Sequence, residues 1–448
     1  MNDFRLADLR DCFEGVIPSI IATSSDDGIP NVSYLSHVEP VDESHIALSN
    51  QFFGKTANNL RANPQASVIV VDGNSGQQIR LAVTWVRNER DGPLFDGMAA
   101  SLRASSAQIG MADIMRLASV DIFRVDAITA LPHPEDLAAP QPGRSRSGLA
   151  QAAEVVARVA AETETARVVD GLLDGVVAML HAPAAILFQY DPARDTLVTL
   201  ASRGYARSGA GSEIASGTGI AGAAAALGRP LRVSDMSRVR RFGAAIRGTS
   251  PDEEEAGVIA LPGLPDAQSQ IAVPMYAKGG LYGVLFAESP ERLAFRSDDA
   301  IALSMVANHA AATLLIGEAL AGEATAPPVA PGPPAPSAPA AGQFRVLHHA
   351  FDDSVFIDNG YVIRGVAGRL LVYLLERHLA EGRVEFSNRE IRLAPDLKLP
   401  DFKDNLETRL LLLRQGLDEK NCPVRLVRAG RGLVRLHLER RPAIERTS

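Results

Sequence analysis

Apolar and polar positions alternate along the first 90 residues in a way that predicts short β-strands. The alternation covers residues 17–24, 30–38, 45–49, 66–71 and 79–88. Side chains of a strand point to opposite faces in turn, so one face of each strand can be buried. A single short helix is predicted over 55–63, ending at Pro64. Short strands at this spacing favour a barrel over a βαβ fold.

Helical spacing replaces this alternation after residue 148. Apolar residues recur at helical spacing from 149 to 180, which predicts one long helix. Two hairpins, over 184–202 and 271–287, and a closing helix over 298–320 follow. This order of helix, antiparallel sheet and helix predicts an α/β domain.

The last hundred residues combine strands with three helices. Helices are predicted over 366–379, 387–393 and 402–417, and a hairpin over 424–438. Ser387, with Glu390 three residues later, has the spacing of an N-cap and its capping box. The pattern predicts an α+β domain.

Two proline-rich segments divide the chain. Residues 133–148 and 323–342 lack apolar periodicity, and the second holds seven prolines between Pro327 and Pro339. Such segments act as extended spacers and cannot form a core. The sequence therefore predicts a multidomain protein with domains at 1–132, 149–322 and 343–448.

Composition and charge narrow the functions. The 448 residues carry a formal charge of −8, which argues against nucleic-acid binding by net charge alone. Cys12 and Cys422 are the two cysteines, and no metal-ligand spacing appears, so we expect no metal. The N-terminus does not resemble a signal peptide, and no apolar run approaches 18 residues. We therefore expect a cytoplasmic protein with no membrane partner.

The first domain carries polar groups suited to a phosphate-bearing cofactor. Ser49, Asn50 and Gln51 end one predicted strand, and Lys55 and Thr56 begin the helix that follows. A helix N-terminus offers free N–H groups to a phosphate, and lysine and hydroxyls complete such a site. The alternative is ordinary turn chemistry at strand ends and a solvated helix start.

Four motifs of the first domain resemble the pyridoxamine-phosphate-oxidase-like FMN-binding family. They are TSSDDGIPNVS at 23–33, LSNQ at 48–51, KTANNLRANP at 55–64 and VIVVD at 68–72. The resemblance implies a split β-barrel that holds FMN at the interface of a homodimer. It implies flavin contacts from Ser33 and Tyr34, ring or ribityl contacts from Ser49, Asn50 and Gln51, phosphate contacts from Lys55 and Thr56, support from Asn59, and further contacts from Gln78 and Arg80.

Two positions depart from that family's vitamin B6 oxidases. Asn31 and Gly54 stand where those enzymes carry arginines, so oxidation of vitamin B6 is not expected. Related members bind F420 or haem, which remain alternatives to FMN.

A glycine-rich run marks the second domain. Residues 217–222, GTGIAG, precede 228–235, GRPLRVSD. No βαβ unit surrounds the run, so a dinucleotide loop is disfavoured. The run and the hairpin at 271–289 resemble a GAF domain, a sensory module that binds cyclic nucleotides, bilins or haem, or that dimerises. The domain has no cysteine to hold a bilin. Phe188, Tyr190 and Asp235 are candidate pocket residues, or alternatively core and turn residues.

The third domain is basic. Residues 343–448 hold 19 Arg and Lys against 15 Asp and Glu, about +4, while the rest of the chain is about −12. A helix followed by a glycine-tipped hairpin resembles a winged helix, which implies a helix in the major groove and a wing in the minor groove. Candidate DNA contacts are Arg409, Arg414, Arg428 and Arg431. Asp401, Asp404 and Glu407 oppose phosphate contacts, so dimerisation or protein binding is the alternative.

Three functions are compatible with these domains. We expect an FMN-dependent oxidoreductase with a GAF domain for ligand sensing, acting on an unidentified small-molecule substrate. The alternative is a one-component transcriptional regulator that senses redox state or a ligand and binds DNA. A scaffold that stores or senses a cofactor is the third. No catalytic side chain is identified, because a flavin itself carries the redox chemistry.

Overall fold

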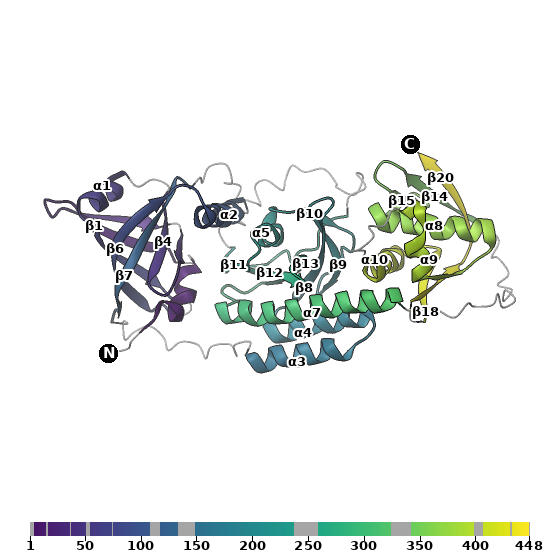
Figure 1. Ribbon diagram of the computed structural model, residues 1–448, viewed down its shortest axis with the longest axis horizontal. Coiled ribbons are helices and arrows are strands. Elements are labelled where there is room, and N and C mark those ends of the chain that lie inside the picture. The colour runs from purple at the N-terminus through teal and green to yellow at the C-terminus, as the bar shows by residue number, and fades with distance from the viewer. Residues whose placement is uncertain are drawn as a thin grey trace.

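The computed structural model describes most of the chain as three domains in a row (Figure 1). The described residues are 4–14, 17–35, 37–50, 54–73, 75–107, 117–132, 148–236, 259–323, 342–397, 406–430 and 432–447. Nearly all of both predicted linkers lies outside these ranges.

The N-terminal domain is a curled antiparallel sheet with strand order β2-β1-β5-β6-β7-β4-β3. Its strands are β1 (Ser19–Ser24), β2 (Pro30–Leu35), β3 (Val38–Pro40), β4 (His45–Asn50), β5 (Gln65–Val71), β6 (Gln78–Glu89) and β7 (Ser119–Ala130). A 3₁₀ helix η1 (Leu6–Glu14) and helices α1 (Gly54–Ala62) and α2 (Pro93–Ala107) complete it. Leu48, Val68, Leu81 and Phe123 fill its inner face. The predicted strand at 30–38 divides into β2 and β3.

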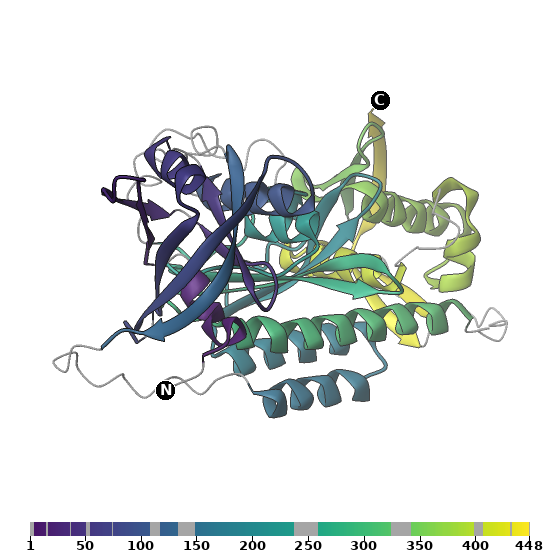
Figure 2. The same cartoon turned by 60° about the vertical axis from the view of Figure 1, so that its left-hand side comes forward.

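The middle domain has a six-stranded sheet with strand order β10-β9-β8-β13-β12-β11. Its strands are β8 (Ala184–Asp191), β9 (Thr196–Arg203), β10 (Glu213–Ala215), β11 (Leu231–Val233), β12 (Ser269–Ala277) and β13 (Gly280–Ser289). Helices α3 (Leu149–Ala161), α4 (Thr165–Leu180) and α7 (Ser297–Glu323) lie together on one side, and α5 (Gly219–Leu227) packs on the other face (Figure 2).

The prediction of one helix over 149–180 is wrong. The structure has two helices, because Glu162 and Glu164 adopt extended backbone and end one helix before the next begins. Val155 and Val159 of α3 are buried in the same core as Val168 and Leu172 of α4. Apolar spacing continued through the break, so periodicity alone did not reveal it.

Helix α7 is long and apolar enough to cross a membrane by length and composition, because an 18-residue window within Ser297–Ala321 has a mean hydropathy of 1.6. The prediction that no apolar run approaches 18 residues is not contradicted, because Asn308 and His309 interrupt the apolar run of this helix. In the structure, Leu303, Val306, Ala310 and Leu314 are buried in the protein core. Packing against the sheet and against α3 and α4 accounts for the apolar composition of this helix.

The C-terminal domain combines two sheets with three helices. The sheets are β16-β15-β14-β20 and β17-β19-β18, built from β14 (Gln343–His349), β15 (Ser354–Ile357), β16 (Gly360–Ile363), β17 (Glu385–Ser387), β18 (Val424–Gly430), β19 (Leu433–Leu438) and β20 (Arg441–Thr447). The helices are α8 (Gly365–Glu381), α9 (Asn388–Leu393) and α10 (Leu406–Glu419), and a short 3₁₀ turn η4 (Pro395–Leu397) follows α9. Ser387 caps α9, as its spacing predicted. The winged-helix interpretation of this domain stays a prediction.

The middle and C-terminal domains share one hydrophobic core. Leu285 and Leu303 of the middle domain belong to the same buried cluster as Leu371, Leu413 and Leu417 of the C-terminal domain. The N-terminal sheet is filled by a separate cluster. The chain therefore folds around at least two main cores, and the second linker joins segments that pack together.

Candidate functional site

The start of α1 is fixed to the edge strand β2 by buried polar side chains. Asn31 donates its amide to the hydroxyl of Thr56 at 2.9 Å, and the hydroxyls of Ser33 and Thr56 lie 3.0 Å apart. Thr56 is buried, whereas Lys55 beside it is exposed. We call Asn31, Ser33, Lys55 and Thr56 the α1 corner. It places one cation and two hydroxyls at a helix N-terminus, where N–H groups lack intrahelical partners.

Two asparagines fix the remainder of α1 to the end of β1. Asn59, which is buried, donates to the hydroxyl of Thr23 at 3.1 Å. Asn63 donates to the hydroxyl of Ser24 at 2.9 Å. Both bonds orient α1 relative to the sheet, and the supporting role expected of Asn59 in a flavin site stays a prediction.

The end of β4 is placed differently from the α1 corner. Asn50 donates to the carboxylate of Asp121 at 3.0 Å, and that carboxylate also accepts bonds from Trp85 and Asn88. Ser49 is 3% exposed, and its hydroxyl has no hydrogen-bond partner among the residues that the structure describes. Gln51 lies outside the described residues. An orphaned buried hydroxyl is uncommon in a folded protein and is a candidate ligand contact.

The remaining predicted flavin residues lie on the outer face of the sheet. Tyr34 is 75% exposed, and Gln78 and Arg80 are exposed on β6. Because side chains alternate along a strand, Tyr34 faces away from the α1 corner, while Ser33 faces into it. The structure therefore divides the predicted set between two faces of the sheet.

The three candidate pocket residues of the middle domain do not converge. Phe188 is buried edge-to-face against Phe286, with ring centroids 6.4 Å apart. The hydroxyl of Tyr190 donates to Asp195 in the β8–β9 turn at 2.8 Å. Asp235 pairs with Arg292 at 2.5 Å.

Sequence reasoning missed a buried carboxyl in that domain. Glu288 on β13 is 2% exposed and accepts bonds from the backbone of Leu264 at 2.5 Å and from Gln270 at 3.1 Å. Burial raises the pKa of Glu288, and burial likewise raises the pKa of Tyr205 nearby. A glutamate inside an apolar strand was the signal that could have revealed this group.

Two of the four candidate DNA contacts, Arg414 and Arg428, lie at the boundary with the middle domain. No side chain of α10 from Leu406 to Leu417 is exposed, so Arg409 and Arg414 are half-buried. Arg414 lines a cavity of about 40 Å³ between the two domains. Arg428 lies 3.7 Å from Glu164 of the middle domain. Arg431 lies outside the described residues.

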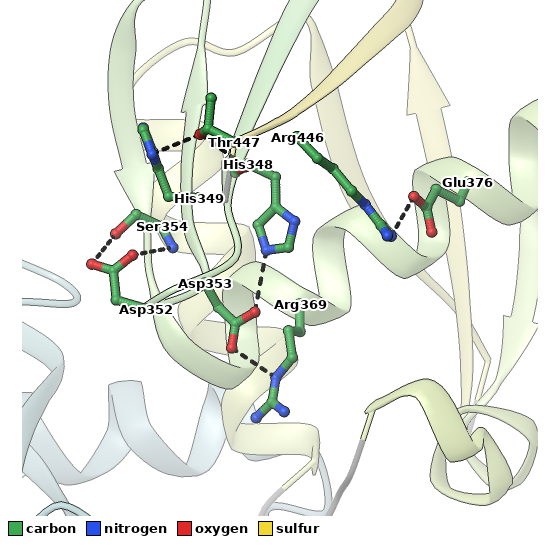
Figure 3. A network of polar contacts seen from close by, with 9 residues as sticks. All are labelled: His348, His349, Asp352, Asp353, Ser354, Arg369, Glu376, Arg446 and Thr447. Atoms are coloured by element: carbon green, nitrogen blue, oxygen red, sulfur yellow. Dashed lines mark hydrogen bonds and ion pairs between the residues drawn. The ribbon is translucent and has the colours of Figure 1, made fainter.

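A polar network crosses the C-terminal sheet (Figure 3). His348 contacts Asp353 at 3.2 Å, and Asp353 pairs with Arg369 of α8 at 3.0 Å. The neighbouring hydroxyl of Ser354 donates to Asp352 at 2.6 Å and so is not activated by the histidine. The network therefore joins β14 to α8 and lacks the arrangement of a hydrolase.

Metal and thiol chemistry find no support in the described part of the chain. No group of three His, Cys, Asp or Glu side chains there could hold a metal ion. Both cysteines are buried and free of disulfides, and burial raises the pKa of Cys422 to about 11. A thiolate nucleophile at Cys422 is therefore disfavoured.

The N-terminal domain is a curled sheet with a polar helix start, and the middle domain is a sheet with helices on both faces. Comparison with known protein families assigns a family to each of these two folds. Residues 7–131 match the family model of pyridoxamine 5'-phosphate oxidase, and residues 162–314 match that of the GAF domain. The N-terminal domain therefore has the flavin-binding fold of the pyridoxamine-phosphate-oxidase-like family, and the middle domain is a GAF domain. No curated protein matches the chain.

Solved structures are similar to parts of the chain. An FMN-binding protein from Syntrophomonas wolfei subsp. wolfei is 17% identical, covering 29% of this chain and 88% of its own, with a TM-score of 0.25. The GAF domain of an Acinetobacter phosphoenolpyruvate-protein phosphotransferase is 15% identical (39% and 97% covered, TM-score 0.32). Free methionine-R-sulfoxide reductase from Neisseria meningitidis is 22% identical (39% and 93% covered, TM-score 0.28).

Proposed function

We propose that the N-terminal domain binds FMN and that the protein is a flavin-dependent oxidoreductase whose GAF domain senses a ligand. The α1 corner carries this proposal. Thr56, held by Asn31 and Ser33, fixes the first turn of α1, and Lys55 stands exposed beside it. A phosphate at this helix start would meet N–H groups and one positive charge.

Two further observations support a flavin on this domain. The buried hydroxyl of Ser49 lacks a hydrogen-bond partner among the described residues, and the outer face of β2 exposes Val32 and Tyr34. In this proposal Lys55 neutralises the phosphate and Thr56 holds the helix start. The flavin, when bound, supplies the electron transfer.

The same outer face supports a homodimer. Ile29, Val32 and Tyr34 are 55%, 64% and 75% exposed on and beside β2, which ends the sheet without a neighbouring strand in the described residues. An exposed edge strand with large apolar side chains is a surface that proteins usually cover. We propose that a second copy of the N-terminal domain covers it.

An absorbance spectrum of the purified full-length protein tests the cofactor. We expect flavin bands and release of FMN on denaturation, with haem or F420 distinguished by their own spectra. A colourless protein that takes up no added FMN would overturn the proposal. Bleaching of the flavin by NAD(P)H would identify an oxidoreductase, whereas an inert flavin would favour sensing or storage.

The shared core favours one-component regulation as the second candidate function. A change in the GAF domain would reach the C-terminal domain through contiguous buried contacts, which is the requirement for coupling two sites. Binding of the full-length protein to a fragment of its own promoter, with steep dependence on salt concentration, would support this function.

A further inference from the structure

Helix α10 presents little surface to solvent before its last two residues, although it belongs to a domain at the end of the molecule. Leu413 and Leu417 are fully buried, and no side chain between Leu406 and Leu417 is exposed. Its own domain covers one side with α8 and β18, and the GAF domain covers the other with α4, α7 and β9. A helix at a domain surface normally keeps a polar face in water. Here the second domain replaces that water.

The first turn of α10 is capped by a side chain from the GAF domain. Glu318, near the C-terminal end of α7, is 4% exposed. Its carboxylate accepts the backbone N–H groups of Glu407 at 3.0 Å and Thr408 at 2.8 Å, and the hydroxyl of Thr408 at 2.8 Å. First-turn N–H groups have no partner inside their own helix, so Glu318 supplies the partners across the domain boundary.

Other groups complete this contact from both domains. Thr408 is fully buried, and its hydroxyl also lies 3.4 Å from that of Tyr282 on β13. Arg392 of α9 donates to the backbone carbonyl of Glu318 at 3.1 Å and lies 3.4 Å from its carboxylate. Glu318 therefore joins the last helix of the GAF domain to both α9 and α10.

Polar and charged pairs lie at the edge of the same interface between the GAF and C-terminal domains. Arg364 pairs with Glu213 of β10, and Ser208 contacts Glu419 at the end of α10. Arg414 makes no ion pair or hydrogen bond with the described residues, and it lines the cavity between the domains. Two arginines suited to a phosphate backbone, Arg414 and Arg428, are thus held against the GAF domain.

We propose that the GAF domain sequesters α10, with Glu318 as the closing contact, and that the C-terminal domain binds a DNA duplex only when this contact opens. The inference rests on the second candidate function, because it takes DNA as the partner of the C-terminal domain. Opening would free a helix bearing Arg409 and Arg414 beside a hairpin bearing Arg428. A helix that enters a groove must first have an exposed face.

Hydrogen exchange and DNA binding, measured on the full-length protein, test the proposal. In Glu318→Ala, we expect the backbone amides of α10 to exchange at least tenfold faster, while β12 and β13 keep their wild-type rates. Affinity for a short mixed-sequence duplex at low salt should rise by tenfold or more. Glu154→Gln, which changes an exposed glutamate on α3, should leave both readouts at the wild-type value.

Two gentler variants keep the test valid if Glu318→Ala does not fold. Glu318→Gln replaces one acceptor oxygen with an N–H donor, so one first-turn N–H group loses its partner and we expect a small increase in both readouts. Thr408→Val removes a hydroxyl but keeps the N–H donor, and should give an intermediate increase in both readouts.

Unchanged exchange in α10 of the altered proteins would overturn the role of Glu318. Faster exchange without a gain in DNA affinity would overturn the sequestration of a DNA-binding surface. Flavin absorbance should be the same in every variant, because the N-terminal domain has its own core. The absorbance spectrum therefore tests the flavin proposal independently of the exchange and DNA-binding measurements.

Discussion

The guanidinium of Arg229, in the loop after α5 of the GAF domain, pairs with the carboxylate of Glu39 on β3 of the N-terminal domain. The same guanidinium donates to the hydroxyl of Ser101 on α2 at 2.5 Å. Arg232, three residues later, lies 3.5 Å from Asp11 of η1. Two arginines of the GAF motif at 228–235 thus contact the N-terminal domain directly, and the motif also serves as a docking segment.

Replacing Arg229 with alanine should loosen the N-terminal domain from the GAF domain. The pair is partly buried, with 36% of the arginine and 19% of the glutamate side chain exposed, so we expect a loss of about 1–2 kcal/mol. Chemical denaturation and hydrogen exchange of β3 and α2 measure it. Arg124→Ala, which breaks an exposed pair within the N-terminal domain, is the control, and equal effects would contradict the docking role.

The contact between Arg229 and Glu39 should weaken at low pH. Burial by itself would raise the pKa of Glu39, but the bond with His37 and the pair with Arg229 outweigh it and hold that pKa at about 2, against an ordinary 4.5. A lowered pKa means that the stabilisation is complete above the unfolded-state value and is lost as the pH falls from there towards 2. The difference in unfolding free energy between wild type and Glu39→Gln should shrink through this window; parallel curves would exclude the mechanism.

Glu318 should give the opposite pH dependence. Burial raises its pKa to about 7 and the nearby charge of Glu407 adds to this, although N–H donors from α10 and the hydroxyl of Thr408 oppose it. Arg392 and Tyr282 also face this carboxyl. Between about pH 4.5 and about pH 7, the folded protein therefore keeps Glu318 protonated, whereas the unfolded chain has released this proton because the ordinary pKa of the group is 4.5. Stability should fall by up to about 3 kcal/mol as the pH rises through this window.

Denaturant unfolding at about pH 5 and about pH 8 measures this slope. Glu318→Gln cannot titrate, so it should be less sensitive to pH than wild type in the transition of the GAF and C-terminal domains. An identical slope in the variant would assign the pH dependence to another group.

Truncation of Leu413 should destabilise two domains at once. Leu413 is fully buried in the core that the GAF and C-terminal domains share, so Leu413→Ala should cost about 2–5 kcal/mol. Calorimetry should show one transition for both domains moving to lower temperature, with the N-terminal transition in place. Leu48→Ala, in the separate N-terminal core, should move only that transition. Independent unfolding of the GAF and C-terminal domains would contradict the shared core.

Thr56→Val should weaken FMN binding. Valine keeps the shape of threonine but removes the hydroxyl that contacts Asn31 and Ser33, at a cost of about 1–2 kcal/mol. We expect a loss of FMN affinity of about 5- to 30-fold by fluorescence titration. Thr199→Val removes a buried hydroxyl paired with Ser212 in the GAF domain and should leave FMN affinity unchanged. Equal affinities in all three proteins would place the phosphate elsewhere.

The strands of the N-terminal domain and the hairpins of the GAF domain could be predicted because their signal is local. Alternation at 66–71 and the turn at 191–195 act over a few residues, and the structure has β5, β8 and β9 there. The motifs at 217–222 and 228–235 likewise identified the GAF domain, which its family model confirms. Helix α2 and strands β7 and β20 were missed, and β20 pairs in parallel with β14 nearly a hundred residues earlier in the chain.

Which surfaces meet was decided only by the tertiary structure. Asn50 was predicted to reach a flavin, yet it bonds to Asp121, 71 residues away. The apolar stripe of α10 predicted a helix with one buried side, but the GAF domain buries its other side as well. Hydrophobic periodicity shows which face of a segment is buried. Packing between distant parts of the chain determines which other segment covers that face.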